Sequence, residues 1–315
     1  MARTRYAPDR GLTARMTATM FLLGLVFVAF IALIIGIGLA THGSTAVIAL
    51  FAVVLGGGML IGSLFYSDKI ALATAGAQVV TPQQAPELHG IVDRICALAD
   101  MPKPRVAIAP AGMPNAFATG RNSEHAVLCV TDGLLRSGLT NEELEGVLAH
   151  EMSHVAHKDV TVMTIASFLG IIAGLMVRFA FYSELFGGGR RNNNNDNAAL
   201  MVFAVMIVSV VVYAVSFLLI RLLSRYRELA ADRSAALLTG QPSALKSALV
   251  KVSQGIGRIP TQDLRAAEGL NAFYFAPAVS FSGGKSLSTL FSTHPSLERR
   301  LAELDKVAKQ LGQAR

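Results

Sequence analysis

The sequence predicts a mainly α-helical integral membrane protein, in which four transmembrane helices accompany a cytoplasmic α+β domain with a small sheet. Three observations lead to this prediction. Apolar residues make up 52% of the 315 residues and charged residues only 16%, whereas soluble domains carry about 25% charged residues. Four apolar stretches are each long enough to cross a bilayer, which takes about 20 residues. Between the second and third of them lies a more polar segment with both helical and strand-like patterns.

The four expected spans form two hairpins and cover residues 16–40, 45–66, 160–182 and 198–223. The first is too long for a cleaved signal peptide and the second follows it at once, so we expect both to be retained. A glycine- and asparagine-rich stretch, residues 183–197, is expected to be the flexible outer loop of the second hairpin. No charged side chain lies near the middle of any span, which disfavours a transporter or a channel.

Arginines decide the expected orientation, because positively charged residues flank membrane spans on the cytoplasmic side. They precede the first span and follow the fourth, and the first link has none. We therefore place three segments in the cytoplasm: the basic N-terminus at 1–15, the segment 67–159 and the segment 224–315. The net charge of +7 is spread along these flanks, so it predicts anchoring to the lipid bilayer of the cell membrane and no nucleic-acid partner.

The cytoplasmic segments are predicted to mix helices with short strands. Leu88, Val92 and Ile95 recur at helical spacing, and Thr140 with Glu143 forms a capping box at the start of a further helix. The expected elements are helices at 86–98, from 140 onward, at 242–252 and at 295–311, strands at 105–109 and 126–130, and a short strand or turn at 115–120. Residues 255–286, rich in glycine, alanine and phenylalanine, could be a mobile or membrane-facing loop.

The helix that starts after Thr140 carries the most informative motif, which reads H-E-x-x-H from His150 to His154. Residues four apart lie on one face of a helix, so both imidazoles can bind one metal ion. Glu151 then lies close enough to accept the proton of a metal-bound water. These residues are the minimal apparatus of a zinc peptidase, although the same spacing also occurs by chance in surface helices.

A catalytic zinc ion usually has three protein ligands and keeps a fourth position for water. His157 lies on the same helical face, but seven residues of helix rise about 10 Å, which is too far for one ion to bind both His150 and His157. Glu228 is the better candidate, because the second hairpin returns the chain to the level of His154. Asp232, one turn after Glu228, could fix the ring of His150 by a hydrogen bond. The alternative is that both acidic residues form a solvated stripe.

Together these motifs resemble those of the HtpX heat-shock membrane zinc proteases, which are relatives of the CAAX prenyl proteases. The resemblance covers nearly the whole chain and includes both hairpins, the H-E-x-x-H motif, Glu228 with Asp232, and residues 115–120 and 292–296. It implies a cytoplasmic α+β zinc-peptidase domain that cleaves misfolded or damaged membrane proteins and holds one zinc ion. On this resemblance the ligands are His150, His154 and Glu228, and Glu151 is the catalytic base. An extended substrate then pairs with an edge strand formed by Asn115, Ala116, Phe117, Ala118 and Thr119.

The oxyanion that forms during peptide cleavage needs a hydrogen-bond donor besides the metal. His294 is the expected catalytic donor because it lies in the last matching motif. Tyr226 and Arg225 are alternatives, and His294 could instead be a turn residue before Pro295. Two other functions stay open for the whole chain: a metalloprotease that processes specific peptides, and a membrane scaffold without proteolytic activity. Chelator-sensitive proteolysis distinguishes the scaffold from both kinds of protease.

Overall fold

The computed structural model describes residues 10–40, 45–187, 196–257 and 294–313, so most of the segment 255–286 lies outside the described residues. The chain forms two compact units. The first comprises Met1–Ala14, Leu64–Thr161 and Ser224–Arg315, and the second comprises Arg15–Ser63 and Val162–Leu223. The cytoplasmic and membrane segments predicted from the sequence are not tested by this division and stay a prediction.

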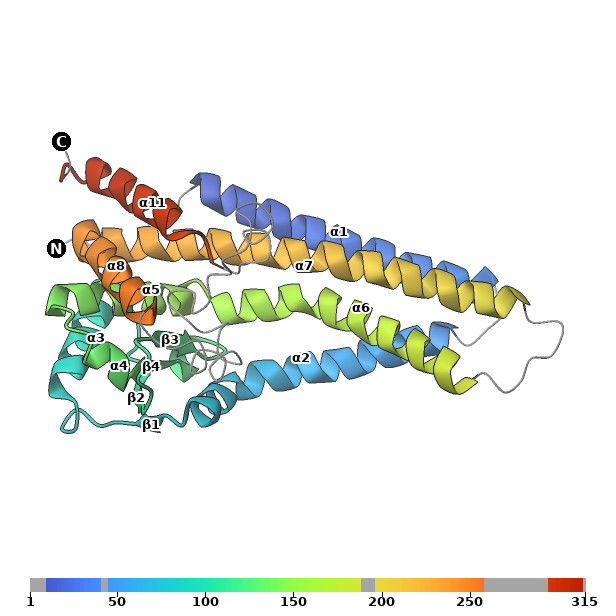
Figure 1. Ribbon diagram of the computed structural model, residues 1–315, viewed down its shortest axis with the longest axis horizontal. Helices are drawn as coiled ribbons and strands as arrows, with labels where there is room; N and C mark the ends of the chain where they lie inside the picture. Colours follow the sequence, from blue (N-terminus) through green and yellow to red (C-terminus); the bar gives the residue numbers. More distant parts are fainter. Residues whose placement is uncertain (1–9, 41–44, 188–195, 258–293, 314–315) are drawn as a thin grey trace. The chain divides into compact units, whose positions relative to one another are not determined.

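The second unit consists of parts of four long helices. These helices are α1 (Arg10–Ala40), α2 (Thr45–Ala75), α6 (Asp159–Gly187) and α7 (Asp196–Thr239) (Figure 1). Its described core joins α1, α6 and α7 through apolar side chains such as Phe30 and Ile172. The rings of Phe27 and Phe168 lie 5.8 Å apart. Many other apolar side chains of these helices face outward, as Phe21 does with 74% of its surface exposed. Such exposed apolar surface is consistent with insertion into a bilayer.

Among the described residues, three helices are long and apolar enough to cross a membrane: Arg10–Leu33, Asp159–Arg178 and Phe203–Thr239. They overlap the first, third and fourth expected spans. Several side chains of the second expected span, 45–66, lie outside the described part, so this span stays a prediction.

The expected bounds of the outer loop, 183–197, overlap the helices on both sides. Helix α6 continues to Gly187 because Leu185 and Phe186 extend its apolar pattern, and α7 begins at Asp196, where an acidic side chain favours a helix start. Helix α7 also continues far beyond its apolar part, because the alanine- and leucine-rich sequence up to Thr239 has high helix propensity.

The first unit is built around a four-stranded mixed sheet in the order β1-β2-β4-β3. Its strands are β1 (Gln78–Val79), β2 (Arg105–Ala109), β3 (Ala116–Thr119) and β4 (Val127–Thr131). The central strands β2 and β4 run parallel, and β1 and β3 pair antiparallel at the two edges. The expected strand 126–130 is shifted by one residue, because Ala126 ends a short 3-10 helix, η1 (Ser123–His125).

Both faces of the sheet are covered, which explains why every residue of β4 is buried. Leu128 and Val130 pack into a core shared with the helices, whereas Val127 and Cys129 point to the other face, where Ala71 of α2 lies. The helices in this core are α3 (Pro86–Ala99), α5 (Asn141–Ala156), the last turns of α7, α8 (Pro242–Gly257) and α11 (Leu297–Gln310).

These helices follow the sequence predictions, with small shifts at their ends. Helix α11 starts at Leu297 rather than 295, because Ser296 is its N-cap and accepts a hydrogen bond from the amide of Arg299. Helix α8 continues five residues beyond the expected 252, to Gly257. Helices α5 and α8 pack closely: a methyl group on Gly146 would lie 3.2 Å from the backbone of Leu245. The short helix α4 (Asp132–Leu135) follows β4 directly.

Candidate active site

Helix α5 holds the H-E-x-x-H motif in buried surroundings. A capping box fixes its first turn, in which Thr140 Oγ1 accepts from the amide of Glu143 and the Thr140 amide donates to Glu143 Oε2 at 2.8 Å. Three turns later His150 is 1% exposed, and His154 is half-buried one turn beyond it. Because the two rings project from the same helical face, their Nε2 atoms lie only 3.3 Å apart.

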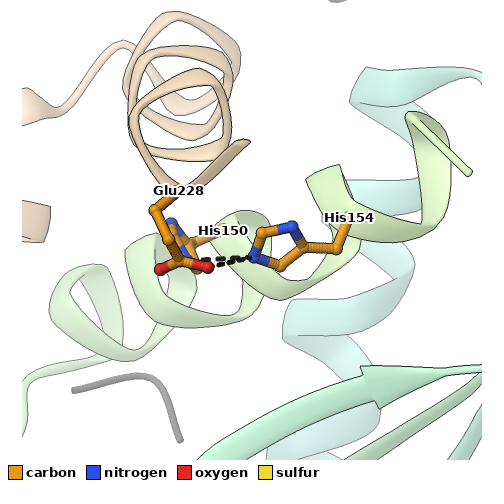
Figure 2. A group of neighbouring side chains, drawn as sticks. All are labelled: His150, His154 and Glu228. Carbon is orange, nitrogen blue, oxygen red and sulfur yellow. Dashed lines mark hydrogen bonds and ion pairs between the residues drawn. The ribbon is translucent and has the colours of Figure 1, made fainter. Parts of the chain in front are cut away.

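Glu228 reaches the same point from helix α7 (Figure 2). Its Oε2 atom lies 3.6 Å from His150 Nε2, and its Oε1 atom lies 3.4 Å from His154 Nε2. The ligand-type atoms of the three residues all lie within 4.8 Å of one another. The structure therefore brings together the three side chains that the sequence nominated as metal ligands.

Each of the two imidazoles contacts a carboxylate through its Nδ1 atom. Asp232 Oδ1 lies 2.9 Å from His150 Nδ1, and Asp159 Oδ2 lies 2.5 Å from His154 Nδ1. A ring that donates its Nδ1 hydrogen to a carboxylate carries a lone pair on Nε2. Both Nε2 atoms are then electron-pair donors, and both face the carboxylate of Glu228.

Each of these carboxylates is in turn held by a buried arginine. Arg300 donates to both oxygens of Asp232, at 2.7 and 2.6 Å. Arg227 forms an ion pair with the Asp159 carboxylate and donates to the backbone oxygen of Asp159 at 2.7 Å. We call these chains the two relays: Arg300–Asp232–His150 and Arg227–Asp159–His154. They fix the orientation of both rings through charge-assisted hydrogen bonds.

This donor set fits a tetrahedral metal ion. Two ligands bound at about 2.0–2.1 Å in a tetrahedral arrangement lie about 3.3–3.4 Å apart. The separations of 3.3, 3.4 and 3.6 Å among His150, His154 and Glu228 are close to that value. Three converging lone-pair donors in a buried site repel one another unless a cation lies between them.

Glu151 lies beside the ligands and is itself 5% exposed. Its Oε2 atom accepts a hydrogen bond of 3.3 Å from the backbone amide of Ala118 in β3. Burial raises the pKa of the Glu151 carboxyl above its usual value, against the opposing influence of His150 and His154. A carboxylate with a raised pKa is a better proton acceptor near neutral pH, as a general base requires.

Comparison with known proteins identifies the family to which this site belongs. The model of peptidase family M48 matches residues 82–308, which include the H-E-x-x-H motif, Glu228 and both relays. The chain belongs to peptidase family M48. It is therefore a metalloprotease, and family membership implies a metal cofactor.

Relatives that match nearly the whole chain are named as homologs of the protease HtpX. "Protease HtpX homolog 1" of Streptomyces coelicolor is 57% identical over 312 residues, covering 99% of this chain and 98% of the relative. "Protease HtpX homolog" of Moorella thermoacetica is 49% identical, covering 99% and 100%. The crystal structure of Ste24p from S. mikatae shares the fold, with a TM-score of 0.51, 18% identity, and coverage of 94% of this chain and 67% of that one. The chain is thus an M48 membrane metalloprotease of the HtpX type.

Of the remaining expected site residues of this M48 chain, His294 contacts the ligand Glu228, and the expected substrate strand contacts Glu151 through Ala118. His294 is buried, and its Nδ1 atom lies 3.1 Å from Glu228 Oε2. Ala116, Phe117, Ala118 and Thr119 form β3, an edge strand of the sheet. Asn115 precedes β3, and its amide donates to Thr131 Oγ1 at 2.8 Å. The catalytic roles of these residues are proposals.

His157 is placed differently from the ligands. It is the residue at which α5 ends, and its ring is not part of the group of converging ligand atoms found among the described residues. Burial lowers the pKa of His157 to about 4, with further lowering by the nearby His154 and Arg227.

Sequence reasoning missed Asp159, Arg227 and Arg300. One signal for Arg300 was available: it shares a helical face with Leu304 and Val307, so a charged residue interrupts the buried face of α11. Asp159 is the last acidic residue before the third expected span, and this position gave no indication of its contact with His154. Arg227 was counted only as a flanking charge.

Proposed function

We propose that this M48 chain is a zinc endopeptidase that cleaves misfolded or damaged membrane proteins at an active site facing the cytoplasm. The observation that carries the proposal is the convergence of His150, His154 and Glu228 beside the buried Glu151. Zinc is the metal that this N,N,O donor set and tetrahedral spacing favour.

In the proposed reaction each side chain has a distinct role. A zinc ion held by the three ligands would supply Lewis-acid polarisation of the scissile carbonyl. Glu151 accepts a proton from the attacking water as the new carbon–oxygen bond forms, and then passes this proton to the amine nitrogen as the carbon–nitrogen bond breaks. His294 donates a hydrogen bond to the developing oxyanion. The two relays keep the ligand imidazoles in place throughout.

Strand β3 supports a specific mode of substrate binding. The amide of Thr131 donates to the carbonyl of Asn115 at 2.9 Å, so Asn115 turns its backbone toward the strand β4 side. Hydrogen-bonded positions alternate along an antiparallel pair, so the backbone N–H and C=O groups of Phe117 and Thr119 also face β4. Those of Ala116 and Ala118 face the open edge of the sheet. An extended substrate that pairs with this edge would pass directly beside Glu151.

The membrane setting rests on three supports. The described residues contain three helices that are long and apolar enough to cross a bilayer. Arginines flank the expected spans on the side of the metal site, which favours a cytoplasmic orientation. The ligand Glu228 comes from α7, which contains one of these apolar stretches, and this suits substrates that are themselves held in the bilayer. The relatives carry the HtpX protease name.

The proposal is tested with full-length protein reconstituted in vesicles together with a destabilised membrane protein. We expect cleavage by the wild type, its loss on chelation and its return with added zinc. Glu151→Gln should retain zinc and lose cleavage, whereas Glu124→Gln, at an exposed position, should behave like the wild type. Cleavage that persists in Glu151→Gln would refute the assigned base. Equal cleavage of stable and destabilised substrates would refute the role in quality control.

A further inference from the structure

A pocket of about 250 Å³ lies in the first unit, where the end of α2 meets the loop that follows β3. Its lining residues are Leu64, Phe65, Asp68, Lys69, Arg121 and His125. We propose that this pocket binds the phosphate group of an anionic phospholipid. The inference rests on insertion of the chain into a membrane and is independent of the proposed peptidase chemistry.

The pocket carries uncompensated positive charge. Asp68, the carboxylate among its lining residues, is held by Arg105 at 2.5 Å. Lys69 lies over the ring of Tyr66, 5.4 Å from its centroid, and the guanidinium of Arg121 lies 4.8 Å from the centroid of Phe65. Among the described residues neither of these two cations pairs with a carboxylate. A lining of this kind attracts an anion.

The loop that presents Arg121 is held in one conformation. Gly120 has a φ of 132°, and a Cβ at this position would lie 2.5 Å from the carbonyl oxygen of His125, so only glycine allows the chain to close here. Asn122 Oδ1 accepts from both the amide and the Nδ1 atom of His125, at 3.0 and 2.8 Å. Thr161 Oγ1 donates to the carbonyl of Arg121 at 3.1 Å.

These contacts leave Arg121 able to bind a phosphate. Because His125 donates through Nδ1, its Nε2 atom accepts from Arg121 Nη2, at 2.7 Å. The guanidinium has five N–H donors in a planar fork, and this hydrogen bond uses one of them. The others can bind phosphate oxygens in the bidentate geometry that arginine favours. The neutral His125 imidazole therefore orients the Arg121 guanidinium and leaves its positive charge unchanged.

The surroundings of the pocket favour a lipid over free phosphate. The apolar run expected to span the membrane ends at Tyr66, and the first charged residues after it are Asp68 and Lys69. Phe65, Tyr66 and Ile70 are 54%, 54% and 56% exposed. Exposed aromatic residues next to a cation are typical of the level at which lipid headgroups lie. The acyl chains would then contact the exposed apolar side chain of Phe65.

The test measures lipid binding to the full-length protein in detergent by native mass spectrometry. The probes are dioleoyl phosphatidylglycerol, dioleoyl phosphatidylcholine and inorganic phosphate as a competitor. The test variant is Lys69→Gln with Arg121→Gln. The matched control is Lys306→Gln with Lys309→Gln, which removes the same number of charges from exposed positions of α11. A second variant, Arg121→Lys, keeps the positive charge but removes the planar guanidinium that binds phosphate in a bidentate geometry.

We expect the wild type to bind phosphatidylglycerol about tenfold more tightly than phosphatidylcholine, given the attraction of each basic residue to anionic lipid. The double variant should lose this preference, the control should keep it, and Arg121→Lys should bind with intermediate affinity. A preference retained by the double variant, or equal binding of both lipids by the wild type, would overturn the proposal. Displacement by inorganic phosphate at equimolar concentration would overturn the lipid assignment. Zinc content of each variant checks that the first unit is folded, whether or not the protein cleaves substrates.

Discussion

Asp159 lies five residues after His154 and places its Oδ2 atom 2.5 Å from the Nδ1 atom of that imidazole. The same kind of contact joins Asp232 to His150: both histidines come from α5, whereas Asp159 comes from α6 and Asp232 from α7. Both metal-facing imidazoles are therefore oriented by a carboxylate, and an arginine neutralises each carboxylate. Zinc affinity should depend on these outer residues nearly as strongly as on the ligands.

Asp159→Asn tests the second of the two relays. The amide can still accept from His154 but carries no charge, and Arg227 loses its anionic partner. We expect zinc affinity to fall about 10–100-fold, measured by competition with a chromophoric chelator. Asp305→Asn is the matched control, because Asp305 pairs with Lys246 at an exposed position. Wild-type zinc affinity in Asp159→Asn would contradict the role of this relay.

Arg300→Leu tests the first relay through stability. Arg300 is 1% exposed and binds both oxygens of Asp232. Its removal leaves a buried carboxylate without its cation, so we expect a loss of about 3–5 kcal/mol in the free energy of unfolding. Thermal denaturation of the metal-free protein in detergent measures the loss. The neighbouring Arg299 is exposed, and Arg299→Leu should stay within about 0.5 kcal/mol of the wild type. Similar losses in both variants would argue against a buried ion pair.

Glu228→Ala and His157→Ala test which residue completes the metal site. The first removes a carboxylate that lies 3.4–3.6 Å from both Nε2 atoms, and the second removes a ring outside the converging group. We therefore expect Glu228→Ala to purify without stoichiometric zinc and His157→Ala to retain it. Elemental analysis of the purified proteins measures the result. The reverse pattern would show that His157 is the ligand.

Ala118→Pro tests the proposed substrate edge. Proline removes the N–H group that faces Glu151 and the open side of β3. The pairing of β3 with β4 uses the neighbouring residues, so an edge strand should tolerate the change. We expect full zinc content with cleavage reduced at least tenfold, because the Glu151 carboxylate loses a hydrogen-bond donor and a substrate strand loses a pairing position beside it. Ala118→Ser keeps the N–H group and serves as the control. Normal cleavage by Ala118→Pro would exclude pairing at this residue.

His157 should make the protein less stable in mild acid. Its pKa in the folded chain is about 4, below the ordinary value of 6.5, so the unfolded chain binds a proton between these values while the folded chain does not. The free energy of unfolding therefore decreases as pH falls from 6.5 to 4, and the pKa difference sets an upper limit of about 3 kcal/mol on this loss. Because the ring is partly exposed, we expect a loss below this limit. Thermal denaturation of the metal-free protein at pH 7.5 and pH 5 measures the loss. His157→Gln should show a smaller drop between these two pH values; an unchanged drop would assign it to other groups.

Local features were well predicted from the sequence because their causes lie within a few residues. The capping box of Thr140 and Glu143 is formed as expected, and β2 has the expected bounds. The position of Glu228 was inferred from topology, since a hairpin must return the chain to the level at which it left. Helix ends were less accurate, because the helical propensity of α7 continues beyond its apolar part.

The outer residues of the site could not be predicted in the same way. Arg300 meets Asp232 only because α11, which packs against α8, brings a long side chain within reach of α7, and no local pattern encodes that contact. The strand order, with β3 at the edge next to Glu151, also depends on long-range pairing. Such contacts become visible only when the distant segments of the first unit are placed together.

The central claim is that one zinc ion is bound by His150, His154 and Glu228. Anomalous diffraction at the zinc absorption edge, from crystals of the zinc-loaded Glu151→Gln variant, tests it most directly. The account predicts a single peak about 2.0–2.2 Å from both Nε2 atoms and from a carboxylate oxygen of Glu228. A fully occupied peak elsewhere, or one that Glu228 does not reach, would contradict it.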